Sequence, residues 1–159
     1  MEISSYAADY CRDNLGIPVI QGSFPHIPIH GTYDIITCWY FLEHCEDPVS
    51  SMRTIHRLLN KGGVFACSVP SIFGPLYLLH RNEWIEHHPA DHRVDFTPGS
   101  LRLLIKNAGF RHIRLAPSGI HPARVIKEDH PLFRPFASCY RLFSRLACFS
   151  DTLEAYALK

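Results

Sequence analysis

Four histidines stand close together between residues 80 and 92, and they give the chain its first recognisable chemistry. Imidazole is both a general base with a pKa near neutrality and a common metal ligand. The cluster comprises His80, His87, His88 and His92, with Glu86 and Asp91 among them. Structural zinc sites usually show tight Cys/His spacing, and no cysteine lies in this segment. We therefore predict solvated histidines and no metal site, and leave open that one of them acts as a general base.

A second set of candidate residues stands where strands are predicted to end. In an open α/β sheet, ligands bind beyond the carboxyl ends of the strands. Such ends are expected at Glu2, at the turn 22–24, at residues 38–40 and at residues 68–71. A carboxylate such as Glu2 can accept hydrogen bonds from both hydroxyls of a ribose, and Trp39 or Tyr40 can offer an apolar face to an adenine. This edge therefore predicts a site for a ribose-bearing ligand.

A strand–helix–strand unit is the element that would position these residues. Residues 34–41 form a near-continuous apolar run, which is typical of a strand buried on both faces of a parallel sheet. Asp47 and Pro48 mark a helix start, which residues 61–63 end. Residues 64–69 then predict the next buried strand. Short turns between such elements indicate a parallel βαβ unit and an α/β sheet.

The flanking segments extend this pattern on both sides. Before it, Ser4 can cap a helix up to about residue 15, and residues 19–21 predict a short strand. After it, residues 97–109 predict a helix and residues 110–116 a strand. Residues 152–159 alternate weakly between apolar and polar side chains, so we expect them to pair with that strand as an antiparallel partner.

Two further segments do not follow this pattern. Residues 71–96 are irregular and carry the histidines, so we interpret them as a lid-like insert. Residues 117–149 predict a loop followed by an amphipathic helix over 136–149. Such a helix can lie on a membrane surface or form a wall for a lipophilic substrate, but a helix that packs on the sheet or caps the site is the favoured interpretation.

The composition is that of a folded protein without a strong charge. Hydrophobic residues make up 47% and charged residues 19% of the 159 residues, and the formal net charge is +1. Such a balance gives no case for a nucleic-acid partner, and no apolar run approaches the ~20 residues of a membrane helix. The six cysteines form no CxxC pair and no signal peptide opens the chain. We predict a single domain over residues 1–159, located in the cytoplasm without stable membrane insertion.

The order of these residues resembles that of a known family. The motifs that carry the resemblance are Asp34-Ile35-Ile36, Phe41-Leu42-Glu43-His44, Asp47-Pro48, Leu58-Leu59, Gly62-Gly63, Pro70, His92, Phe96-Thr97 and residues 101–110. Together they resemble the class I S-adenosylmethionine (SAM) methyltransferases. Within that family they are similar to the subgroup of ubiquinone-biosynthesis O-methyltransferases and small-molecule or sugar methyltransferases.

The resemblance implies a fold, a cofactor and a set of contacts. The fold would be a Rossmann-like sheet with helices on both faces, and the cofactor would be SAM. The positions that match cofactor-binding segments of the family are Glu2, Ile3, Ser23, Phe24, Cys38 and Trp39. The implied reaction is methyl transfer to a small-molecule acceptor, with oxygen as the favoured acceptor atom.

A hydroxyl acceptor also gains from a base whose pKa lies near the operating pH. By their place in the motif, His92 is the first candidate for that base and His88 the second. Glu43 and His44 are interpreted as structural.

The chain departs from the family at its amino-terminal side. The first strand and glycine-rich loop of the family should precede the acidic residue by ~20 residues, and only Met1 stands before Glu2. We expect a truncated sheet in which residues 19–21 move beside strand 34–41, or in which residues 1–32 are loosely placed. We then expect the chain to be a fragment of an active enzyme. The alternative is a non-catalytic methyltransferase-like module that binds a partner.

Overall fold

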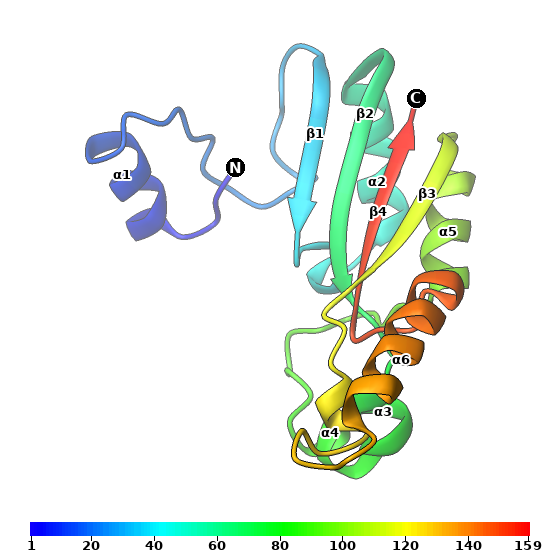
Figure 1. Ribbon diagram of the computed structural model, residues 1–159. Coiled ribbons are helices and arrows are strands. Elements are labelled where there is room, and N and C mark those ends of the chain that lie inside the picture. Colours follow the sequence, from blue (N-terminus) through cyan, green and yellow to red (C-terminus); the bar gives the residue numbers. More distant parts are fainter. The chain divides into compact units, whose positions relative to one another are not determined.

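The computed structural model describes all 159 residues, which form two compact units, Met1–Gly31 (unit 1) and Thr32–Lys159 (unit 2). Unit 1 holds one helix, and unit 2 holds a four-stranded sheet with the remaining helices (Figure 1). The α/β class predicted from the sequence is therefore confirmed.

Unit 1 is built on the helix α1 (Ser5–Asp13). Its start is the predicted one, because the hydroxyl of Ser4 accepts a hydrogen bond from the amide of Ala7. The expected strand at residues 19–21 is wrong as a strand: only an isolated parallel bridge between Glu2 and Gln21 forms there. The sheet contains no strand from this segment, so residues 19–21 do not extend it beside residues 34–41.

The sheet of unit 2 has the strand order β1-β2-β4-β3. β1 and β2 are parallel, as the βαβ pattern predicts, and β4 runs antiparallel to both of its neighbours. The predicted antiparallel pairing of the last strand with the strand near residue 111 is thus confirmed. The strands are β1 (Tyr33–Trp39), β2 (Leu59–Pro70), β3 (Arg111–Ser118) and β4 (Thr152–Leu158).

β2 begins earlier than the sequence predicts. The preceding helix, α2 (Pro48–Leu58), ends at Leu58 and not at residues 61–63. The pairing with β1 shifts register between Tyr33 and Ile35, so β2 contains extra residues at this point. Gly62 has φ +79°, a conformation that glycine adopts without steric cost. The glycines therefore form an irregular stretch of strand and not a helix end.

β1 is not buried on both faces, and this expectation is wrong. It lies at the edge of the four-stranded sheet of unit 2, and Ile35 is 63% exposed. Its apolar sequence is that of an interior strand, but its burial is that of an edge strand. The difference arises because burial depends on neighbouring strands as well as on the strand's own residues.

The core of unit 2 lies between the sheet and the helices α2 and α5 (Pro98–Asn107). Figure 1 shows both helices behind the sheet. α5 begins as predicted, with a capping box between Thr97 and Ser100. The fully buried side chains include Met52, Ile55, Phe65, Leu101, Ile105 and Leu153. Each contributes about 1.5–3 kcal/mol through burial.

The insert over residues 71–96 is more regular than expected. It contains two short helices, α3 (Pro75–Leu79) and α4 (Arg81–Glu86). A bridge between Ser71 and Phe96 joins its two ends. Gly74 approaches the chain at Ser150 so closely that a Cβ would lie 2.5 Å from the backbone there. The insert is thus fixed to unit 2 and does not hang from it as a free loop.

Two short 3-10 helices also occur, η1 (Leu42–His44) after β1 and η2 (Pro122–Arg124) after β3. The last helix is α6 (Phe133–Ala147), which follows η2. It packs through Ala137, Tyr140 and Ser144, which are buried. It contacts β3, as expected for a helix that packs on the sheet, but it begins and ends earlier than the predicted range 136–149.

Candidate functional site

The site of unit 2 lies where β1 ends and the insert returns to the sheet. η1 follows β1 directly and presents Glu43 and His44. The backbone carbonyl of Glu43 accepts hydrogen bonds from the amides of Arg93 and Val94, at 2.7 and 3.2 Å. These bonds hold the insert against η1, although the two segments lie about fifty residues apart in the sequence.

Three imidazole rings meet at this point, and we call them the histidine cluster: His44, His88 and His92. The His92 ring lies edge-to-face with both others, at centroid distances of 4.8 Å to His44 and 5.4 Å to His88. The structure therefore brings together the two predicted base candidates and adds His44, which the sequence pattern indicated as structural.

Two carboxylates hold the outer rings of the cluster. His44 Nδ1 lies 3.2 Å from an oxygen of Asp91, and His88 Nε2 lies 3.0 Å from an oxygen of Asp95. The centroid of the His88 ring also lies 4.4 Å from that of the Trp84 ring. Burial, followed by the neighbouring His44 and His88, lowers the pKa of His92. The central imidazole is therefore disposed to be neutral, which is the form that accepts a proton.

Glu43 is a buried acidic residue. Its side chain is 1% exposed, and neither carboxylate oxygen has a hydrogen-bond partner. Burial raises the pKa of this carboxyl group. Removing a carboxylate from water without hydrogen bonds is costly, so a proton or a nearby cation would relieve the site.

The ligand atoms of two groups of three residues lie within 4.8 Å of one another. One group is Glu43, His44 and His92, and the other is His88, His92 and Asp95. Imidazole and carboxylate are ligand types that divalent ions such as Zn²⁺ accept, so each group could hold such an ion. The remaining two histidines of the sequence cluster have other contacts. His80 meets the Arg124 carbonyl at 3.1 Å, and His87 meets the Glu83 carbonyl at 2.9 Å.

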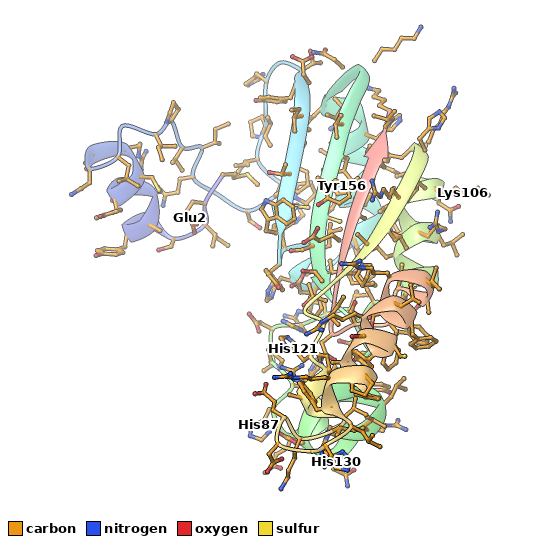
Figure 2. All side chains as sticks on the ribbon, viewed as in Figure 1. Glu2, His87, Lys106, His121, His130 and Tyr156 are labelled. Atoms are coloured by element: carbon orange, nitrogen blue, oxygen red, sulfur yellow. The ribbon has the colours of Figure 1, made fainter.

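Figure 2 shows His87 beyond the carboxyl end of β1, toward the helices of the insert. Sequence reasoning missed Asp95 and the closeness of Glu43 to His92. The position of Glu43 and His44 directly after a strand end was the available signal, because such ends are where α/β proteins bind ligands. Nothing in the local sequence indicated that residues 92–95 would return to them.

The predicted cofactor residues fall in both units. In unit 1, the amide of Glu2 donates to the Ile20 carbonyl at 3.1 Å, and the amide of Gly22 donates to the Glu2 carbonyl at 2.9 Å. These bonds bring Glu2 and Ile3 beside the turn that carries Ser23 and Phe24. One oxygen of the Glu2 carboxylate accepts from the Ser4 amide at 2.8 Å. Figure 2 labels Glu2 within this unit.

In unit 2, Cys38 and Trp39 stand at the end of β1. Trp39 is 50% exposed and so has a free apolar face. Cys38 pairs in register with Cys67 on β2, and a hydrogen bond between the two thiols is the main cause that raises the pKa of Cys38. Because the thiolate is the nucleophilic form, this cysteine is a poor nucleophile. The thiol is therefore unsuited to covalent chemistry.

Residues 6–115 match the family described as "Methyltransferase domain". The chain belongs to this methyltransferase family. The resemblance to the class I SAM methyltransferases is thus confirmed, and with it SAM as the cofactor of the family.

Two curated relatives of the methyltransferase carry the same name. The chain is 31% identical over 88 residues to the ubiquinone biosynthesis O-methyltransferase of Pseudomonas paraeruginosa, covering 50% of this chain and 37% of that protein. It is 32% identical over 100 residues to the protein of the same name from Aeromonas salmonicida, covering 57% and 40%. The aligned region thus spans about two fifths of the length of these relatives.

Solved structures support the fold of the methyltransferase. A SAM-dependent methyltransferase from Thermotoga maritima, described as a possible histamine N-methyltransferase, superimposes with a TM-score of 0.69 at 16% identity. The superposition covers 98% of this chain and 70% of the Thermotoga maritima chain. A SAM-dependent methyltransferase from Mesorhizobium loti gives 0.60 at 16% identity, covering 99% and 77%. None of the helices combines the length and apolar character needed to cross a bilayer.

Proposed function

We propose that this methyltransferase transfers a methyl group from SAM to a small-molecule acceptor, with a hydroxyl oxygen as the favoured acceptor atom. The observation that carries the proposal is the histidine cluster, because it sets a partly buried imidazole at the carboxyl end of β1. The similarity to ubiquinone biosynthesis O-methyltransferases supports oxygen as the acceptor atom.

Each unit carries proposed cofactor contacts of its own. The free oxygen of the Glu2 carboxylate accepts from the ribose hydroxyls, and Ile3, Ser23 and Phe24 line the adenine. Cys38 and Trp39 contribute the strand-end contacts, with the exposed face of Trp39 against an apolar part of the cofactor.

His92 is the proposed general base. When bound, SAM supplies a sulfonium methyl group, which passes to the acceptor oxygen while the sulfur keeps the electron pair of the broken bond. His92 accepts the hydroxyl proton of the acceptor. The nearby charges of Asp91 and Asp95 favour the imidazolium that results. His88 is the second candidate, but its Nε2 already meets Asp95 at 3.0 Å.

The exposed edge of β1 supports a further part of the proposal. In the family that the sequence resembles, the first strand lies beside the strand that corresponds to β1. We propose that a strand and glycine-rich loop of that kind pair with β1 in the working enzyme, so that the 159 residues are one part of it. The exposed Ile35 would then be covered. Six free cysteines support a reducing compartment, the cytoplasm.

Calorimetric titration tests the cofactor part of this proposal. The chain would be compared with a fusion that places the amino-terminal strand and glycine loop of a ubiquinone biosynthesis O-methyltransferase before it. We expect SAM to bind the fusion much more tightly than the chain alone. Failure of the fusion to bind, with intact secondary structure, would favour the alternative of a non-catalytic module that binds a partner.

Methyl transfer is then measured with the fusion and a panel of phenols, catechols and aliphatic alcohols, using mass spectrometry to detect a gain of one methyl group. Loss of a general base costs about 10²–10⁴-fold in rate. We expect His92→Gln to lose that much in kcat with SAM affinity unchanged, and His87→Gln, the matched control, to retain activity. Equal activity of both variants would exclude His92 as the base.

A further inference from the structure

The helix α6 carries three different faces. Ala137, Tyr140 and Ser144 form the buried face that packs on unit 2. A second stripe, Cys139, Leu142, Phe143 and Leu146, follows the same i, i+3, i+4 spacing but lies on the exposed side of the helix. Leu142 is 61%, Phe143 52% and Leu146 80% exposed. We call these four side chains the apolar stripe.

The third face of α6 is basic. Arg134, Arg141 and Arg145 are exposed, and at about 100° per residue they fall on one side of the apolar stripe. No aspartate or glutamate occurs between residues 130 and 150. None of the three arginines therefore has an acidic neighbour on its own helix, although the chain as a whole is nearly neutral.

Packing within the domain explains only the first of these faces. Burial of one face accounts for an ordinary amphipathic helix, but such a helix normally shows polar residues everywhere else. The apolar stripe instead exposes three large side chains side by side. Figure 1 shows α6 along the flank of unit 2.

We propose that α6 binds the surface of an anionic phospholipid membrane, with the apolar stripe in the acyl boundary and the arginines at the headgroups. Interfacial helices combine large apolar side chains with arginine and lysine and enter the bilayer by about 5–10 Å. The long arginine side chains can reach the phosphates while their aliphatic parts stay with the apolar residues.

The size of the stripe favours a lipid surface over a protein partner. A stable protein interface uses roughly 20–30 residues on each side, whereas four side chains on one helix form a much smaller patch. A membrane needs no shape complementarity and accepts a single helix. The binding is peripheral, consistent with the finding that no helix can cross a bilayer. The inference goes beyond methyl transfer and does not depend on it.

Co-sedimentation of the chain with vesicles tests this inference. The vesicles would contain either phosphatidylcholine alone or phosphatidylcholine mixed with phosphatidylglycerol. We expect binding to the anionic vesicles, weakened by salt, and little binding to the neutral ones. A juxtamembrane arginine contributes about 1 kcal/mol at an anionic surface, so the double variant R141Q/R145Q should bind about thirtyfold more weakly. The double variant L142Q/L146Q should lose at least about tenfold.

Matched controls separate the stripe from general surface effects. Leu103, on α5, is 56% exposed, and Arg53, on α2, is also exposed. The variants L103Q and R53Q therefore make the same kinds of substitution away from α6. Both should bind the anionic vesicles as the wild type does. If L142Q/L146Q loses its circular dichroism signal, the single variant L146Q replaces it. Absence of binding to anionic vesicles would overturn the proposal, as would equal losses in L103Q. A concentration-dependent dimer that L142Q/L146Q abolishes, without vesicle binding, would overturn it in favour of self-association.

Discussion

β1 and β2 are parallel neighbours with similarly apolar sequences, yet their burial differs sharply. Phe65 and Val69 on β2 are fully buried, whereas Ile35 on β1 is 63% exposed. β2 has a strand on each side and helices against it, while β1 lies at the edge of the sheet. The comparison shows that an apolar sequence indicates that a strand is suited to a buried position. The neighbouring strands and helices determine whether the strand is in fact buried.

The largest expected effect is the difference in stability loss between a buried residue of β2 and an exposed residue of β1. Phe65 is fully buried and packs on the Phe110 ring at 5.4 Å. Phe65→Ala leaves a cavity and should lower the free energy of unfolding by about 3–5 kcal/mol. Ile35→Ala removes an exposed side chain and should change it by no more than about 0.5 kcal/mol. Urea unfolding followed by circular dichroism measures both. A loss of several kcal/mol in Ile35→Ala would mean that β1 is covered in solution.

The second prediction compares two acidic residues near the end of β1. Glu43 is buried without a hydrogen-bond partner, whereas Glu46 is exposed. Glu43→Gln removes the penalty of burying a carboxylate, so we expect it to stabilise the protein by about 1–3 kcal/mol at neutral pH. Glu46→Gln is the control and should have little effect. Urea unfolding in the presence of a chelator measures the difference.

The pH dependence fixes the sign of this effect. Burial raises the pKa of Glu43 in the folded protein above its value in the unfolded chain. The protonated form therefore favours folding below the unfolded pKa, and that stability is lost as the pH rises through the folded pKa. The advantage of Glu43→Gln should grow over this range. If added Zn²⁺ instead makes the wild type the more stable protein, Glu43, His44 and His92 form a cation site.

Local signals predicted the parts of the fold that depend on local chemistry. The starts of α2 and α5 follow from Asp47-Pro48 and Thr97-Pro98, because capping involves residues only three positions apart. The burial of β1 depends on which strands lie beside it, and no property of residues 33–39 contains that information. The end of α2 also differed, because the glycines after it serve an irregular strand.

The same division applies to the site. The strand-end position of Trp39 could be predicted from the sequence. His92 was predicted as a candidate base, and the structure places its ring between those of His44 and His88. The burial of Glu43 could not be predicted, because the amides of Arg93 and Val94 that fix the insert over it lie far away in the chain. Asp95 was missed for a different reason: its partner His88 lies only seven residues earlier, but the segment between them has no helical or strand spacing that would predict the contact.

The third prediction concerns the exposed edge itself. An apolar edge strand can pair with another chain, and an edge lysine opposes such pairing. Ile35→Lys should therefore reduce aggregation on concentration or mild heating, while changing the free energy of unfolding by only a few tenths of a kcal/mol. Light scattering measures aggregation, with Ile35→Val as the apolar control. Unchanged aggregation in Ile35→Lys would indicate that β1 is not the surface through which copies associate.

The smallest expected effect lies at the outer end of the β2 core. The His56 ring meets Phe110 edge-to-face at 4.9 Å, and Phe110 in turn packs on Phe65. Burial, followed by the charge of Lys159, lowers the pKa of His56 in the fold. A lowered pKa adds stability above the unfolded value, about 6.5 for histidine, and this stability is lost as the pH falls through the folded pKa.

Unfolding measured between pH 7.5 and 5 should therefore show a small loss of stability that His56→Gln reduces, while the lowered pKa of His92 leaves a remainder in that variant. The exposed His26, replaced by glutamine as a control, should leave the whole loss in place. If His56→Gln loses as much stability between pH 7.5 and 5 as the wild type does, the loss arises from the histidine cluster instead. That result would make the end of β1, and not the core beneath β2, the part of the protein whose stability responds to mild acid.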